Sequence, residues 1–439
     1  MSTGESEPPF LAFPPGFFWG AAVSAHQTEG ENTSSDWWAA EQAGTVPHCS
    51  GRACDSWNRW PDDVASARDL NLSALRLSVE WARIEPEPGC FSQPALDHYR
   101  RVIECVRKAG LEPIVTLHHT TNPLWLAERG AWTSSEVVPR FAEYADRVGR
   151  ALGDLVEWWV TINEPTVSGI FGYLTGLWPP HRHNAWGLYL RHASHCLRGH
   201  AAARAALRGR HGHARASMAL HINPLDPLNQ RDPTDWAAVR IYDWLWQGLF
   251  LQLAAPHLDW VGINYYFRLL VRWDLLPWSL FAPPHMGTGE KTEFNWEIYP
   301  EGLYRVLQRV GRLHKPVIIT ENGIADADDD QRPRYIVEHL RQAHRAIRDG
   351  VDLRGYVHWS LLDNFEWAEG YTKRFGLLSV DFATQVRTPR PSARIYASIA
   401  RANGLGGQIV RRAHERSTGD YPPGGQGAVV TTVGSPGEG

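Results

Sequence analysis

Two glutamates, each directly after a short apolar run, are the residues best placed to do chemistry. Glu164 comes after the run 158–163 and Glu321 after the run 317–320. If both runs are parallel strands of one barrel, both carboxyl groups lie at the same end of it. Glycoside hydrolysis needs such a pair, because one carboxyl protonates the leaving oxygen while the other, ionised, attacks or activates water. The alternative for either glutamate is a helix cap or a partner for an arginine.

Other apolar runs carry or lead into side chains that suit a ligand with many hydroxyl groups. Amides, an imidazole, a phenol and a carboxylate form hydrogen bonds with hydroxyls, and indole faces pack on C–H surfaces. For each tryptophan the alternative is simple packing in the core. The candidates are Gln27, Arg76, His119, Asn163, Asn264, Tyr266, Trp359, Glu366 and Trp367.

The elements that must position these residues alternate along the chain. Apolar runs predict strands near 17–24, 72–79, 113–119, 158–165, 216–223, 260–266, 316–323 and 355–361. Helical periodicity predicts helices over 94–109, 137–155, 186–207, 236–253, 303–313, 335–347 and 392–402. Such alternation favours an α/β fold with parallel strands, and eight rounds are typical of a single (β/α)8 TIM barrel with its active site at the C-terminal strand ends. The count alone leaves a doubly wound sheet open.

The composition predicts one domain. We expect the barrel to span 11–406, with a flexible N-terminus over 1–10 and a flexible tail over 407–439, whose end is rich in Gly and Pro. A net charge of −4 disfavours a nucleic-acid partner. The 21 tryptophans outnumber Tyr and Phe, at 14 each, which indicates either core packing or a surface for flat ligands.

The cellular setting is predicted from the cysteines and the hydropathy. The five cysteines are scattered without C-x-x-C spacing, which favours free thiols in a reducing compartment. The first ten residues do not read as a signal peptide, and no apolar run is long enough to span a bilayer. We therefore expect a cytoplasmic protein without a membrane partner.

Four segments carry a resemblance to a known family. They run from Phe18 through Gly30, over 161–165 (Thr-Ile-Asn-Glu-Pro), over 319–323 (Ile-Thr-Glu-Asn-Gly), and from Trp359 through Leu377. In this order they resemble the signatures of glycoside hydrolase family 1, the retaining β-glucosidases and β-glycosidases. The similarity extends over about residues 13–404. It implies a (β/α)8 barrel that removes terminal β-glycosyl residues through a covalent glycosyl-enzyme, most simply as a β-glucosidase.

The resemblance also implies a role for each candidate residue. Glu164 matches the general acid/base and Glu321 the nucleophile. Arg76, Asn264 and Tyr266 match the residues that support the carboxyl pair, and Asn163 matches the one that binds the sugar 2-hydroxyl. The remaining sugar contacts are then Gln27, His119, Glu366 and Trp367, with Trp359 as a platform under the ring.

One departure from the family pattern bears on which sugar is bound. Thr120 follows His119, where the family usually has an aromatic residue, so the glycone preference is open between gluco, galacto and fuco sugars. Glu366 disfavours a 6-phosphoglycoside substrate, because a carboxylate repels phosphate. Trp273, Trp278 and Trp296 are predicted to contact the aglycone, with plain packing as the alternative.

Other functions were weighed against this one. The expected partners are small β-glycosides or oligosaccharides, and the mechanism needs neither a cofactor nor a metal. The pairs His181/His183 and His211/His213 have i, i+2 spacing but no third ligand in view, which disfavours a metal-dependent sugar isomerase. A non-catalytic carbohydrate-binding protein on the same barrel is the alternative, because fold alone does not determine function. The sequence does not specify the oligomeric state.

Overall fold

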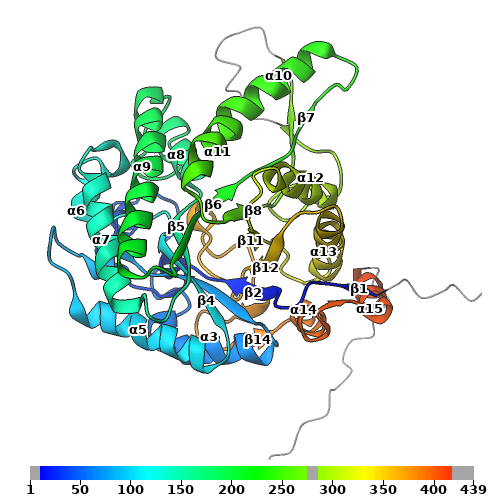
Figure 1. Cartoon of the computed structure of the whole chain (residues 1–439), viewed down its shortest axis with the longest axis horizontal. Coiled ribbons are helices and arrows are strands. Elements are labelled where there is room, and N and C mark those ends of the chain that lie inside the picture. Colours follow the sequence, from blue (N-terminus) through cyan, green and yellow to red (C-terminus); the bar gives the residue numbers. More distant parts are fainter. Residues whose placement is uncertain (1–9, 274–284, 418–439) are drawn as a thin grey trace, which may run out of the picture.

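The structure is a computed structural model that describes residues 10–273 and 285–417. Eight parallel strands close into a barrel in the order β2-β3-β4-β5-β6-β8-β11-β12, and β12 pairs again with β2 (Figure 1). The strands are β2 Phe18–Ala22, β3 Ala74–Ser78, β4 Glu112–His118, β5 Trp158–Asn163, β6 Arg215–His221, β8 Val261–Asn264, β11 Val317–Asn322 and β12 Leu353–Trp359. All eight predicted strands are present, and closure rules out the doubly wound sheet.

Alternation of side chains along the strands produces two cores. One cluster fills the barrel and takes one residue from each of several strands, among them Ala22, Ala74, Ile114, Val160 and Ile318. The larger cluster lies between strands and helices, where it includes Leu75, Val115 and Ile319 from the neighbouring strand positions. Successive residues of a strand point to opposite faces, so one short apolar run supplies both layers.

Long helices cover the barrel. They are α3 Ser56–Asp69, α5 Gln93–Lys108, α7 Val137–Leu152, α9 Trp186–Arg210, α12 Pro300–Gly311, α13 Arg332–Arg348 and α14 Pro391–Ala402. Each predicted helix is present except that 236–253 is divided into α10 Pro233–Asp243, a π-helical turn Trp244–Gly248 and α11 Leu249–Ala254. The helix α3, which was not predicted, links β2 to β3.

A small projection rises above the barrel beside α10 (Figure 1). It contains a three-stranded sheet of β10 His285–Met286, β9 Leu269–Val271 and β7 Leu225–Pro227. Leu225 and Val271 pack there against Tyr242 of α10. These insertions, which follow β6 and β8, extend the wall on the C-terminal side of the strands.

The predicted domain boundary at residue 406 is wrong, because residues 407–417 form the helix α15 Gly407–Ser417. Val410 and Ala413 are buried in the main core, and α15 packs on α13 and α14. Their i, i+3 spacing gives the helix one apolar face, which the Gly- and Pro-rich composition further along the tail obscured. A strand pair nearby joins β1 Leu11–Ala12 to β15 Gly404–Leu405. The predicted flexible stretches 1–9 and 418–439 lie outside the described residues.

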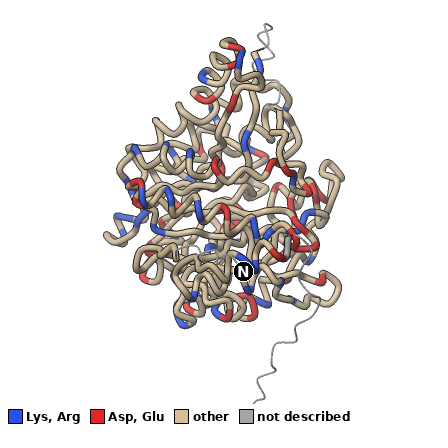
Figure 2. The backbone as a smooth tube through the Cα atoms, turned by 90° about the vertical axis from the view of Figure 1, so that its right-hand side faces the viewer, with Lys and Arg blue, Asp and Glu red and all other residues tan. Residues whose placement is uncertain are grey.

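Charged residues of both signs are interspersed over the molecule rather than gathered by sign (Figure 2). Within the described residues, no helix has the length and apolarity needed to cross a membrane.

Candidate active site

The two glutamates lie where β5 and β11 end. Glu164 directly follows β5 and has left-handed backbone angles, φ 44° and ψ 56°, before Pro165 begins the short helix α8 Pro165–Gly169. A non-glycine residue in this region is strained by about 1–3 kcal/mol, which is common where a side chain must be aimed. Glu321 is the second-last residue of β11, and Gly323 comes directly after the strand. A Cβ atom at Gly323 would lie 1.8 Å from the carbonyl oxygen of Trp359. Only glycine permits this close approach of β11 to β12.

Both oxygens of Glu321 are held by donors. Arg76 Nη1 donates to Oε1 at 2.5 Å, and the Tyr266 hydroxyl donates to Oε2 at 2.6 Å. Arg76 is 1% exposed and Glu321 is 4% exposed, so this ion pair is shielded from water. Hydrogen bonds from charged donors are the stronger kind, and they fix the carboxylate in one orientation.

Amide groups connect the two glutamates. Asn163 Oδ1 accepts from Arg76 Nη2 at 2.7 Å and from Asn264 Nδ2 at 3.1 Å. Asn264 Nδ2 also donates to Glu164 Oε1 at 2.8 Å. The other end of the Asn264 amide is held by Thr320, because Thr320 Oγ1 donates to Asn264 Oδ1 at 2.7 Å. The two carboxyl groups are therefore parts of one buried network.

The electrostatics of the pair favour one shared proton near neutral pH. Burial raises the pKa of Glu321 to about 7, the Arg76 guanidinium opposes this rise, and the charge of Glu164 adds to it. Burial alone would raise the pKa of Glu164 too, but His221 and Asn264 hold it below its ordinary value. Protons on such interacting groups belong to the pair. The two shifts alone would leave that proton on Glu321, but the guanidinium of Arg76 at Oε1 and the hydroxyl of Tyr266 at Oε2 both favour the ionised form, and on these contacts we assign the negative charge to Glu321.

The predicted sugar contacts surround this pair. The His119 ring lies nearly parallel to two indoles, with its centroid 5.8 Å from that of Trp359 and 6.3 Å from that of Trp367. Asn163 Nδ2 donates to His119 Nε2 at 3.2 Å, which leaves the proton on Nδ1. Nδ1 is buried and has no partner among the described residues. An unsatisfied buried donor beside a carboxyl pair is suited to a ligand hydroxyl.

Gln27 and Glu366 lie side by side at the edge of this group. Gln27 Nε2 donates to the Phe365 carbonyl at 2.9 Å and reaches Glu366 Oε2 at 3.5 Å, while Gln27 Oε1 accepts from Ser24. Burial, and next the charge of Glu321, raise the pKa of Glu366 to about 8. The raised pKa favours the protonated form of Glu366 toward neutral pH, and in that form the carboxyl offers both a donor and an acceptor.

The three tryptophans predicted at the entrance have different surroundings. Trp296 packs on Tyr266 with ring centroids 5.4 Å apart, which places it at the wall of the site. Trp273 packs with Leu225 and Tyr242 in the projection, and its backbone N–H donates to Asp235. That packing fits the alternative of a structural role for Trp273. Trp278 lies outside the described residues.

Several residues near the site were not predicted. His221 ends β6 with Nδ1 3.3 Å from Glu164 Oε1. Trp178 packs on Trp367 at 5.6 Å between centroids, and His26 lies flat against the same indole at 5.7 Å and 2°. His221 lies near the end of the predicted strand 216–223, so its place at the strand ends could be predicted from the sequence, whereas its approach to Glu164 could not.

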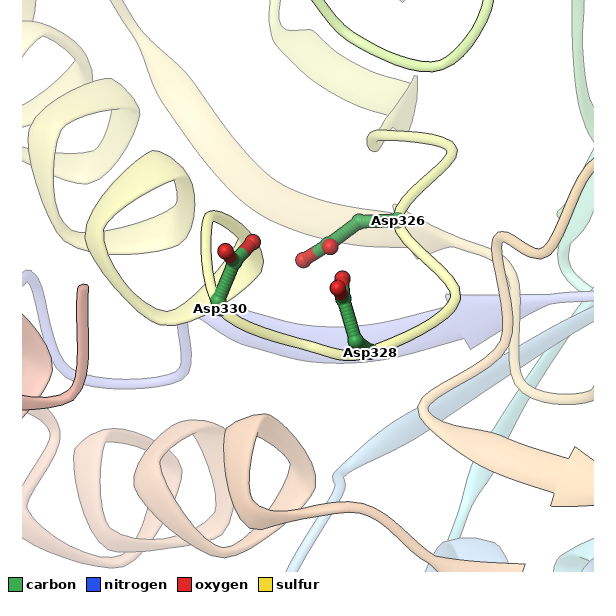
Figure 3. Close-up of side chains that lie close together, drawn as sticks. All are labelled: Asp326, Asp328 and Asp330. Atoms are coloured by element: carbon green, nitrogen blue, oxygen red, sulfur yellow. The ribbon is translucent and has the colours of Figure 1, made fainter. Parts of the chain in front are cut away.

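Three carboxylates outside the pair gather in the loop after β11, where Asp326, Asp328 and Asp330 point toward one another (Figure 3). Asp326 already accepts hydrogen bonds from the backbone N–H groups of Gln331 and Arg332, which explains its burial. Asp328 and Asp330 are exposed. Negative charges near the N-terminus of a helix are stabilised by the helix dipole, and α13 begins directly after this cluster. The cluster therefore has a structural explanation. His211 Nε2 donates to the carbonyl of Gly149, and His213 Nε2 donates to the carbonyl of Gly153.

Fold and site together define an α/β-barrel enzyme of the class that uses a pair of carboxyl groups to act on sugars. The profile of glycosyl hydrolase family 1 matches residues 11–257 and 251–405. The chain belongs to glycosyl hydrolase family 1. The predicted family and fold are confirmed.

Characterised relatives and solved structures agree with the family assignment. The chain is 35% identical to β-glucosidase A of Thermotoga maritima, a match that covers 90% of this chain and 98% of that protein. It is 33% identical to a bifunctional β-D-glucosidase/β-D-fucosidase of Bifidobacterium breve, over 87% of this chain and 96% of the relative. A β-glycosidase structure from Pyrococcus horikoshii superposes with a TM-score of 0.88 at 36% identity, covering 92% and 99% of the two chains. The alternative of a non-catalytic binding protein finds no support among these proteins.

Proposed function

We propose that this enzyme is a retaining exo-β-glycosidase in which Glu321 is the nucleophile and Glu164 the general acid/base. The enzyme is a β-glycosidase, as its family and its relatives indicate. The observation that supports this assignment of roles is that the two carboxyl groups have different polar contacts. Glu321 accepts hydrogen bonds from a guanidinium and a phenol, one at each oxygen, whereas the contacts of Glu164 with the described residues are a hydrogen bond from the Asn264 amide and a 3.3 Å approach of the His221 imidazole, both at Oε1.

In the first step, Glu321 Oε attacks the anomeric carbon of the bound sugar while Glu164 protonates the departing glycosidic oxygen. The C–O bond to the aglycone breaks, and a glycosyl ester forms on Glu321. Such attack requires carboxyls about 5–5.5 Å apart, which the family pattern implies. The negative charge of Glu321 helps Glu164 keep its proton until this moment.

In the second step, the same Glu164 acts as a base. Once Glu321 is esterified its charge is gone, so Glu164 is ionised more readily and removes a proton from water. The water oxygen attacks the anomeric carbon, the ester breaks, and the sugar leaves with its original β configuration. Glu164 regains a proton and Glu321 its charge, so the cycle closes without a cofactor.

For the sugar itself, we propose a terminal non-reducing β-D-glucosyl group, with galactosyl and fucosyl groups also accepted. Support comes from the donor on His119 Nδ1, from Glu366, and from Thr120, which replaces the aromatic residue usual in the family. Relatives named β-glucosidase, β-galactosidase and β-glucosidase/β-fucosidase fit this range. Trp296 is the proposed aglycone contact, since it adjoins Tyr266.

The setting proposed for this reaction is the cytoplasm, with small glycosides or oligosaccharides as the partners. All five cysteines are free thiols, and Cys54 and Cys196 are buried without forming a disulfide. Free thiols are typical of a reducing compartment.

Azide rescue tests the assigned roles. Glu321→Ala should lower kcat by about 10⁴-fold or more, and azide should restore turnover of an activated β-glucoside as the α-glucosyl azide. In Glu164→Ala, azide should instead give the β-glucosyl azide, because it attacks the glycosyl-enzyme. Full activity of Glu321→Ala without azide, or the opposite azide products, would contradict the roles. A rate panel of β-gluco-, galacto-, fuco-, manno- and xylosides tests the glycone range.

A further inference from the structure

His221 is a titratable residue at the site for which the reaction as described above has no role. It ends β6, its side chain is 15% exposed, and Nδ1 lies 3.3 Å from Glu164 Oε1. Its other ring nitrogen, Nε2, is 2.8 Å from the amide nitrogen Nδ2 of Asn223. Both nitrogens therefore face polar groups of known type.

The contact with Asn223 determines where the ring proton lies. An amide N–H donates, so Nε2 must accept, and a neutral imidazole then carries its proton on Nδ1. Asn223 is itself fixed by Gln247, which accepts from the Asn223 backbone N–H at 2.9 Å and donates to its carbonyl at 2.7 Å. The proton on Nδ1 then lies on the ring nitrogen that is 3.3 Å from Glu164 Oε1, a close approach without a formed hydrogen bond.

Aromatic packing holds the imidazole in this position. The ring lies against Tyr266, with centroids 5.9 Å apart and planes 24° apart, and against Phe267 at 5.6 Å. Tyr266 is the same residue whose hydroxyl donates to Glu321. One aromatic stack therefore supports both carboxyl groups.

In the part of the chain that the structure describes, the polar contacts of the Glu164 side chain fall on one of its oxygens. Oε1 faces Asn264 Nδ2 at 2.8 Å and His221 Nδ1 at 3.3 Å. We propose that His221 is a positioning residue for Glu164, whose Nδ1–H holds Oε1 so that Oε2 delivers the proton to the glycosidic oxygen and later takes one from water. This inference rests on the acid/base role proposed for Glu164.

The same contact adjusts how tightly Glu164 holds its proton. Burial and the charge of Glu321 favour the protonated acid, and a donor to the carboxylate opposes them. The charged and titratable groups around this pair are Glu164 and Tyr266 in contact with the ring, and Arg76, Glu321 and Glu366 beyond them. His221 therefore keeps Glu164 acidic enough to give its proton away and to become a base in the second step.

The test is the pH profile of His221→Phe and His221→Gln. The alkaline limb of kcat/KM for an alkyl β-glucoside, which reports the acid form of Glu164, should move up by about one pH unit in His221→Phe. His221→Gln keeps an amide donor, so its limb should move less. For dinitrophenyl β-glucoside, whose leaving group needs no acid, kcat/KM should change less than about 2-fold.

His213→Phe, at a remote loop, is the matched control and should leave both limbs unchanged. An unmoved or lowered alkaline limb in His221→Phe would overturn the inference, as would equal losses for the alkyl and dinitrophenyl substrates, since those indicate a merely structural role. A different result would overturn the proposed function itself: if Glu164→Ala hydrolysed the alkyl glucoside at the wild-type rate, Glu164 would not be the general acid/base.

Discussion

A single guanidinium binds two residues at the site, since Arg76 Nη1 lies 2.5 Å from Glu321 Oε1 while Nη2 lies 2.7 Å from Asn163 Oδ1. Arg76 comes from β3, Asn163 from β5 and Glu321 from β11, so three strands of the barrel meet at one planar group. Its rigid fork fixes the carboxylate and the amide relative to one another. Closure of the barrel is what makes this meeting possible, because β3 and β11 are not neighbours in the sheet.

Arg76→Lys should reduce kcat/KM by about 10²- to 10³-fold, because an ammonium cannot hold Glu321 and Asn163 together. The acid limb of the profile should also move to higher pH. Arg76 favours the ionised form of Glu321, so weakening the contact raises the pKa of Glu321 further. Initial rates from pH 4 to 9 measure both effects. Arg354→Lys, on an exposed surface pair, is the control, and a limb that stays in place would contradict the role assigned to Arg76.

Glu366→Gln should make the enzyme more stable at alkaline pH. The folded-state pKa of Glu366, about 8, exceeds its ordinary value of 4.5, so the folded protein binds more protons between these values. Its contribution to stability therefore falls as pH rises from about 4.5 through 8. Above pH 8 the free energy of unfolding of the variant should exceed that of the wild type by about 1–3 kcal/mol, and near pH 4 the two should be equal. Thermal unfolding measured from pH 4 to above pH 8 tests this prediction, with the exposed Glu87→Gln as the control. An equal gain in stability at low and at high pH would contradict it.

Ala413→Asp should destabilise the enzyme by about 2–4 kcal/mol, because it buries a carboxylate where α15 packs on the barrel helices. Arg412→Ala, on the exposed side of α15, should change stability by less than about 0.5 kcal/mol. Denaturant unfolding compares the two. If both variants match the wild type, α15 contributes nothing to the fold and the boundary near 406 is the better one.

Much of the fold could be predicted because the apolar strands are short and separated by periodic helices. The strand-end argument predicted Glu164, Glu321 and Tyr266 before any geometry was available, since barrel closure brings all eight ends to one face. The helix α15 was hidden by the Gly- and Pro-rich composition that follows it, because few apolar residues, among them Val410 and Ala413, mark its buried face. The role of His221 was hidden for a different reason: it depends on a distance to Glu164 from a neighbouring strand, and one histidine at a strand end does not reveal that distance.

The mass of the enzyme after reaction with 2,4-dinitrophenyl 2-deoxy-2-fluoro-β-glucoside tests the central claim most directly. The fluorine slows both steps by destabilising the oxocarbenium-like transition state, and the activated leaving group still permits the first. The account predicts an intact mass larger by one 2-deoxy-2-fluoroglucosyl group, with peptide mapping placing that group on Glu321. No adduct, or an adduct on Glu164 or any other residue, would contradict it.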